Sequence, residues 1–128
     1  MFLYFKRYTP FLAITAILVL SLIPGQFQVR TGASRHLEHF AAYFAVAGVL
    51  ALAWGKAPLK LFCVGVLLMG LAATMEIAQV LVPGRTARLS DLAASDLGVA
   101  SGLVAMWILL RLLPLMNRAM APRPRAKP

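Results

Sequence analysis

Four apolar runs alternate with short polar or basic segments along the chain, and the third, from about 59 to 82, is long enough at the helical rise to cross a bilayer. The pattern therefore predicts an all-α fold, an integral membrane bundle of four transmembrane helices. Their expected extents are about 8–24, 37–55, 59–82 and 91–113.

Helix-start and helix-stop residues set these limits. Thr9 and Pro10 have the pattern of an N-cap followed by proline in the first turn, and Ser90 is the expected N-cap of the last helix. Pro114 is expected to close that helix. The basic start and short first run also fit a secretory signal peptide, but the exit of this run lacks an Ala-x-Ala site. We therefore expect an uncleaved first span.

Composition supports lipid as the solvent of these helices. Hydrophobic residues make up 61% of the 128-residue chain, and the mean hydropathy is +0.81. A protein of this length has too little interior to hide so many apolar side chains from water. Residues 1–116 are expected to form one membrane domain, and the basic, proline-rich segment 117–128 a disordered cytoplasmic tail. Cys63 is the single cysteine, which excludes a disulfide framework and a thiolate metal site.

The basic residues flank the apolar runs, and the formal net charge is +9. Because no aromatic-interleaved basic patch or binding motif accompanies them, we expect no nucleic-acid partner. With four spans, nine of the 13 lysines and arginines fall on the side of both termini. The positive-inside rule then places the N- and C-termini in the cytoplasm.

This orientation gathers the polar chemistry at the outer end of the bundle. Both histidines and all four acids fall there: Glu38, Glu76, Asp91 and Asp96. Glu76 and Gln79 are three residues apart on an apolar helix and project from one face. His39 and Tyr43 share a face of the second helix. The candidate ligand-binding cluster is His39, Tyr43, Glu76, Gln79, Arg85, Arg88, Asp91 and Ser95.

Two interpretations of this cluster remain open. Charged groups within membrane helices are by default functional-site candidates, but paired charges also hold helices in register. His36 and His39 with Glu76 or Asp91 have the residue types of a divalent metal site, yet no HExxH-type pattern accompanies them, so no metal or other cofactor is expected.

A stripe of small residues runs along the last helix at intervals of four: Ala94, Gly98 and Gly102. Small residues at this spacing let a neighbouring helix approach closely. The stripe is therefore expected to be a helix-packing surface, either within the bundle or between two copies of the chain.

Three short patterns follow one another between residues 35 and 105. They are His39-Phe40-x-x-Tyr43, then Glu76-x-x-Gln79 with Pro83-Gly84-Arg85, then Asp91-x-x-x-Ser95-x-x-Gly98. In order and helix context they resemble the patterns of VanZ-like membrane proteins. Ser95 stands where that family has Asn, Arg35-His36 where it often has Asp-Lys, and Arg88 is an additional base. The resemblance implies a multi-pass envelope protein of the bacterial cytoplasmic (inner) membrane. The family is named for a member linked to teicoplanin resistance, and the resemblance implies no particular reaction.

Three classes of function follow. The first is a binding module for an anionic lipid-linked envelope component or a glycopeptide-type ligand, with Arg85 and Arg88 holding a phosphate or carboxylate. The second is an enzyme acting on lipid phosphates with His39 or Glu76 as acid or base, for which no nucleophile motif or phosphate loop is present. The third is a proton-coupled transporter, which four spans would support most readily as a homo-oligomer. The expected partners are membrane lipids and this anionic ligand.

Overall fold

The computed structural model describes residues 2–27, 32–54 and 57–119, and within these ranges it contains helices and no strand. In chain order the elements are α1 (Phe2–Leu22), the short 3-10 helix η1 (Gly25–Phe27), α2 (Arg35–Trp54), α3 (Pro58–Gln79) and α4 (Leu89–Ala119). The predicted all-α fold is therefore confirmed in the described ranges.

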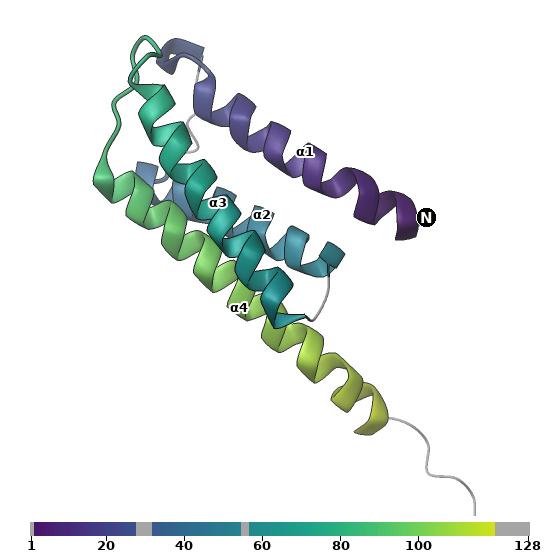
Figure 1. Ribbon diagram of the computed structural model, residues 1–128. Helices are drawn as coiled ribbons and strands as arrows, with labels where there is room; N and C mark the ends of the chain where they lie inside the picture. The colour runs from purple at the N-terminus through teal and green to yellow at the C-terminus, as the bar shows by residue number, and fades with distance from the viewer. Residues whose placement is uncertain (1, 28–31, 55–56, 120–128) are drawn as a thin grey trace, which may run out of the picture.

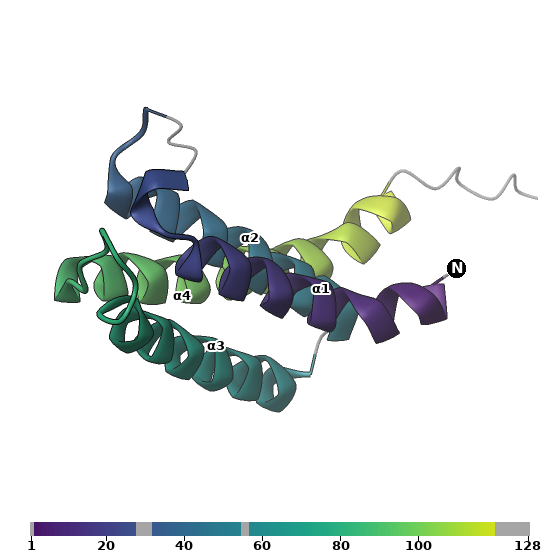
Figure 2. The same cartoon turned by 90° about the horizontal axis from the view of Figure 1, so that it is seen from above.

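The four α-helices run alternately in opposite directions (Figures 1 and 2). The start of α1, the end of α2 and the end of α4 lie toward one end of the molecule. The opposite end carries η1, the start of α2 and the loop from α3 to α4. We call this second end the polar end, because the clustered acids and histidines of the sequence lie there.

Three helices are long and apolar enough to cross a membrane: Arg35–Trp54, Pro58–Gln79 and Leu89–Met116. The apolar part of α1, Arg7–Leu22, is shorter. Many large apolar side chains on these helices are exposed, as is expected of surfaces that face lipid rather than water.

The helix limits predicted from two prolines and one serine are wrong. α1 begins at Phe2 and contains Pro10, and α4 continues past Pro114 to Ala119. Proline removes one backbone hydrogen bond and bends a helix, and long apolar helices tolerate this loss. Ser90 lies inside α4, which begins at Leu89. The predicted tail of 117–128 therefore begins inside α4, and the rest of it lies outside the described residues.

The closest packing is between α2 and α4, where glycine takes the place of a side chain. A Cβ atom on Gly98 would collide with the backbone carbonyl of Phe40, and one on Gly102 with that of Phe44. Gly98 and Gly102 of the small-residue stripe thus face α2 of the same chain. Ala94, the first residue of the stripe, is half-buried. A homodimer through this stripe would have to displace α2.

The loop from α3 to α4 turns sharply through Pro83 and Gly84. The Arg85 N–H donates to the Val82 carbonyl at 3.1 Å, and Gly84 has a φ of 76°, which is the left-handed region that a type II turn requires at this position. The turn directs Arg85 to α1, where its guanidinium donates to the carbonyls of Leu20 at 3.0 Å and Ser21 at 2.6 Å. Arg85 therefore connects this loop to the end of α1.

Candidate functional site

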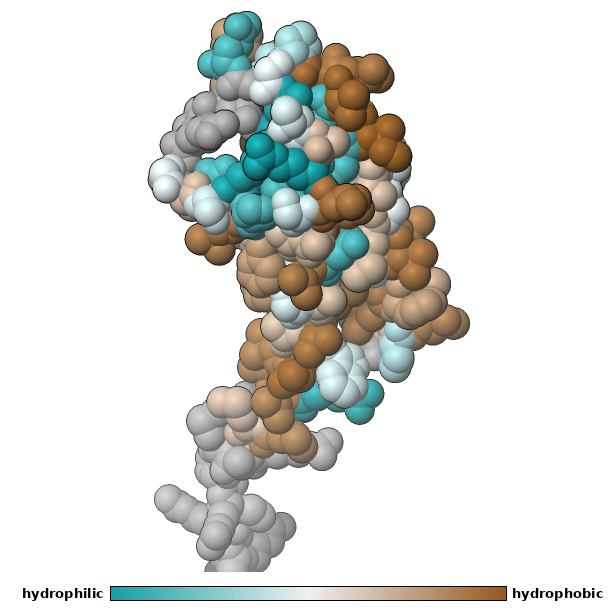
Figure 3. Space-filling view, turned by 90° about the vertical axis from the view of Figure 1, so that its left-hand side faces the viewer, coloured by the Kyte–Doolittle hydropathy of each residue, from teal (hydrophilic) through white to brown (hydrophobic). Residues whose placement is uncertain are grey.

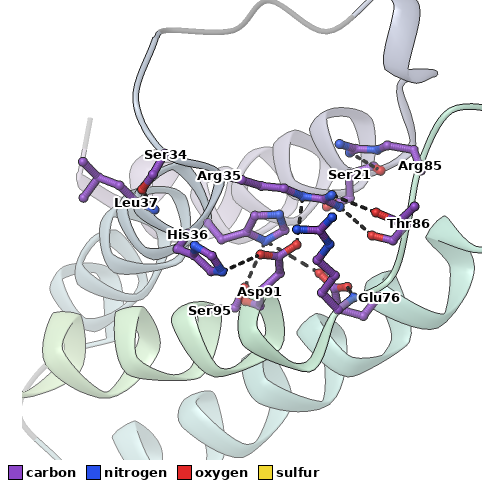
Figure 4. Close-up of polar contacts among 12 residues, drawn as sticks. Ser21, Ser34, Arg35, His36, Leu37, Glu76, Arg85, Thr86, Asp91 and Ser95 are labelled. Atoms are coloured by element: carbon purple, nitrogen blue, oxygen red, sulfur yellow. Dashed lines mark hydrogen bonds and ion pairs between the residues drawn. The ribbon is translucent and has the colours of Figure 1, made fainter.

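Asp91, in the first turn of α4, is the most deeply buried acid of the polar end, with 0% of its surface exposed. Arg35 at the start of α2 places Nε 2.8 Å from Asp91 Oδ2, and His36 places Nε2 3.4 Å from Oδ1 (Figure 4). Neither carboxylate oxygen has a hydrogen-bond partner of suitable geometry among the described residues, so the contact with Arg35 is an ion pair without an aligned N–H.

Arg35 is held on its other side by the α3–α4 loop. Its terminal nitrogens donate to the Thr86 hydroxyl at 3.0 Å and to the Thr86 carbonyl at 2.6 Å. Because the same guanidinium contacts Asp91, it ties the start of α2 to the loop and to α4. Arg35 was absent from the predicted cluster. Its spacing of four from His39 and eight from Tyr43 on one helical face was the available signal.

Glu76, in the last turn of α3, is 6% exposed and faces the start of α4. Its Oε2 accepts the backbone N–H of Arg88 at 3.0 Å, and its Oε1 lies 3.8 Å from His39 Nδ1. Arg88 immediately precedes α4, so the carboxylate lies at the positive end of the helix dipole and satisfies one free N–H group there.

His39 and Ser95 connect the two acids. His39 Nδ1 lies 3.2 Å from Ser95 Oγ, and Ser95 Oγ donates to the Asp91 backbone carbonyl at 3.0 Å. The same nitrogen of His39 therefore faces both Ser95 and Glu76. A serine nucleophile activated by a histidine requires one ring nitrogen for the hydroxyl and the other for the acid. Ser95, at 1% exposed, does not have this geometry.

A cavity of about 520 Å³ opens beside this network, between α1 and α2. Its apolar lining includes Ile17 and Leu20 of α1 and Leu37, Ala41 and Ala42 of α2. Its polar lining includes Arg35, Glu38, His39, Tyr43, Gln79 and Arg85. The space-filling view shows hydrophilic residues gathered at the polar end, with largely apolar surface below them (Figure 3).

Gln79 borders the cavity from α3 and is 1% exposed. Neither its amide oxygen nor its amide nitrogen has a hydrogen-bond partner among the described residues. Leaving a buried amide unpaired costs about 1–3 kcal/mol for each group. Such an arrangement is expected where a ligand or an ordered water completes the bonds.

The structure divides the predicted cluster into two groups. His39, Glu76, Asp91 and Ser95 form the contact network, and Tyr43, Gln79 and Arg85 line the cavity together with His39. Arg88 stands apart: its backbone serves Glu76, but its side chain is exposed and is not part of the cavity lining. The predicted pairing of Arg85 with Arg88 around one anion is therefore not the arrangement found, because Arg35 is the arginine that accompanies Arg85 at the cavity.

Comparisons with known proteins add no relative. No family model, no curated protein and no solved structure matches the chain.

Proposed function

We propose that this chain is a VanZ-like protein of the bacterial inner membrane that binds the anionic head group of a lipid-linked envelope component. The cavity between α1 and α2 is the proposed binding site. The proposal includes four membrane spans, with α1 as the first, and both termini in the cytoplasm. The polar end would then lie at the outer surface of the membrane.

The observation that carries the proposal is the composition of the cavity lining. Two arginines, Arg35 and Arg85, border the same cavity although they are 50 positions apart in the chain, and Glu38 is the one acid among the lining residues. Apolar side chains of α1 and α2 line the same cavity. A charged head beside an apolar surface is the chemistry of an amphiphile, and a guanidinium suits phosphate or carboxylate oxygens.

Gln79 supports a ligand that has neutral polar groups as well as a charge. Its buried amide has a free donor and a free acceptor at the cavity. A hydroxyl or amide of a glycerol, sugar or peptide head group could bond both. This is the composition of lipid-linked envelope components and of glycopeptide-type ligands.

The family resemblance supports the same class of role. VanZ-like proteins are multi-pass envelope proteins, and the member for which the family is named is linked to resistance to the glycopeptide teicoplanin. Because the comparisons identify no relative, this support rests on the three quoted patterns alone. An enzymatic function with Ser95 as the nucleophile has less support, because Ser95 is buried and its hydroxyl donates to a backbone carbonyl.

The test is lipid binding by the purified full chain in detergent, measured by native mass spectrometry. We expect a short-chain phosphatidic acid to bind at least about tenfold more tightly than the phosphatidylcholine with the same chains, since a charged hydrogen bond is worth about 1.5–3 kcal/mol. Equal affinity for the two lipids would contradict the proposal.

Variants locate the binding. Ala42→Leu fills the cavity without removing a polar group and should abolish the preference for phosphatidic acid. Ala45→Leu is the matched control, because Ala45 is exposed on the same helix and is not part of the lining. Arg111→Gln removes one positive charge from the opposite end of the molecule and should leave the preference intact.

A further inference from the structure

We propose that His39, Glu76 and Asp91 bind one divalent transition-metal ion, of the class of Zn²⁺ and Mn²⁺, where α2, α3 and α4 meet. Each residue offers one ligand atom, and these three atoms all lie within 4.8 Å of one another. The cluster shares His39 with the lining of the head-group cavity, but Glu76 and Asp91 are not part of that lining, so the metal site can hold or fail independently of the proposed function.

The spacing of the three side chains is close to that of a metal site. Bonds of ~2.0–2.2 Å to nitrogen and carboxylate oxygen place tetrahedral ligands about 3.4 Å apart. His39 Nδ1 and Glu76 Oε1 are already 3.8 Å apart, which is long for a hydrogen bond and suitable for an ion between them.

Asp91 provides a second, independent observation. Its side chain is fully buried, and neither carboxylate oxygen has an aligned hydrogen bond among the described residues. An ionised carboxylate has about four acceptor positions. Arg35 Nε and His36 Nε2 contact these oxygens as ion-pair partners without an aligned hydrogen bond, so acceptor positions remain that a cation shared with Glu76 would satisfy.

Charge favours the same conclusion. Glu76 and Asp91 bring two carboxylates to one buried point from two different helices. The positively charged Arg35 guanidinium contacts Asp91. Glu76 accepts a hydrogen bond from the backbone N–H of Arg88, and this N–H group carries no net charge. A divalent ion between the carboxylates would offset the remaining negative charge where the surrounding dielectric constant is low.

The groups around the cluster are those expected outside the direct ligands of a metal. Arg35 holds Asp91 on one side, and the Arg88 N–H holds Glu76 on the other. Such contacts fix the orientation of metal-binding carboxylates. Ser95 Oγ lies 3.2 Å from His39 Nδ1 and offers a further side-chain oxygen beside the cluster. His39 also lines the cavity, which gives an ion a route to the site.

The donor set selects the class of metal. One imidazole with two carboxylates suits Zn²⁺, Mn²⁺ or Fe²⁺, whereas Ca²⁺ and Mg²⁺ favour oxygen ligands alone. The ion would join three helices at the polar end. Its binding should therefore stabilise the folded protein in proportion to its occupancy.

The experiment is a titration of the full chain in detergent after removal of metal with EDTA. Calorimetry with Zn²⁺ or Mn²⁺ should give one ion per chain, and Co²⁺ should give a visible absorption band from nitrogen and oxygen ligands. Glu76→Gln, Asp91→Asn and His39→Gln each preserve side-chain size and should weaken binding by at least about tenfold. Asp96→Asn removes an acid of α4 outside the cluster and should bind the metal as tightly as the wild type does. Cys63→Ser should also bind as the wild type does, which would exclude the thiol as a metal ligand.

Thermal unfolding separates loss of the ion from loss of the fold. Zn²⁺ should raise the melting temperature of the wild type and of Asp96→Asn, but not that of any cluster variant that remains folded without metal. The proposal is overturned if the wild type gives no Co²⁺ band, or if Glu76→Gln binds Zn²⁺ as tightly as the wild type. The Co²⁺ result decides the question even if every cluster variant fails to fold.

Discussion

The Arg88 backbone N–H donates to Glu76 Oε2 at 3.0 Å, so a side chain from the end of α3 caps the start of α4. The two residues are 12 positions apart, and the loop between them contains the Pro83-Gly84 turn. A carboxylate in this position both accepts a free N–H and interacts favourably with the helix dipole. Glu76 therefore has a structural role whatever else it binds.

This role predicts a difference between two substitutions of Glu76. Glu76→Gln keeps an oxygen that can accept the Arg88 N–H, whereas Glu76→Leu leaves that part-buried N–H without this acceptor. We expect Glu76→Leu to unfold more easily than Glu76→Gln by about 1–3 kcal/mol. Unfolding of the detergent-solubilised protein by SDS, with EDTA present, measures the difference. Equal stability of the two variants would show that the cap contributes nothing.

A second prediction concerns the Arg35–Asp91 ion pair. Arg35→Met leaves the fully buried Asp91 without its guanidinium, and breaking a buried pair in this way costs about 3–5 kcal/mol. Arg35→Met with Asp91→Leu removes both charges and should recover most of that loss. The same unfolding measurement gives the double-mutant cycle. Thr86→Val is the control, because it removes only the hydroxyl that Arg35 also binds.

A double mutant no more stable than Arg35→Met would contradict this account. The loss would then come from the packing of the Arg35 side chain or from its bonds to Thr86, and not from an uncompensated carboxylate.

A third prediction tests the close approach of α2 and α4. Gly98→Ala places a methyl group against the Phe40 carbonyl, which belongs to the backbone and cannot rotate away. We expect a loss of about 1–3 kcal/mol, as for overpacked cores. Gly70→Ala is the matched control, because nothing lies within 4 Å of its added Cβ. That substitution should be neutral or stabilising, since alanine is the better helix former.

The order of the helices could be predicted from the sequence, because long apolar runs dominate the hydropathy pattern. The helix ends were less accessible. Pro10 and Pro114 lie within helices in the structure, because a long apolar helix remains stable after losing one backbone bond. A sequence-based prediction treats such prolines as boundaries, since it includes no estimate of the stabilisation from neighbouring turns.

The residues of the polar end could also be predicted in part. Helical spacing and the positive-inside rule placed Glu76, Asp91 and His39 at one level of the bundle, and in the structure these residues meet. The partners of Arg35 and Arg85 could not be predicted from the sequence. Arg85 binds the carbonyls of α1 and Arg35 contacts Asp91, and both pairings depend on how the loops fold back on the helices. Local sequence spacing does not encode such long-range contacts.

The last prediction concerns orientation in the membrane. Ala87 in the α3–α4 loop and Met116 near the end of α4 are both exposed and lie toward opposite ends of the molecule. In a Cys63→Ser background, a single cysteine at Ala87 should react with a membrane-impermeant maleimide added to intact spheroplasts. A cysteine at Met116 should react only after the membrane is permeabilised, because the basic residues flanking that end favour the cytoplasm. The reverse pattern would invert the orientation and place the polar end in the cytoplasm. Reaction of both cysteines in intact spheroplasts would mean that α4 does not cross the membrane.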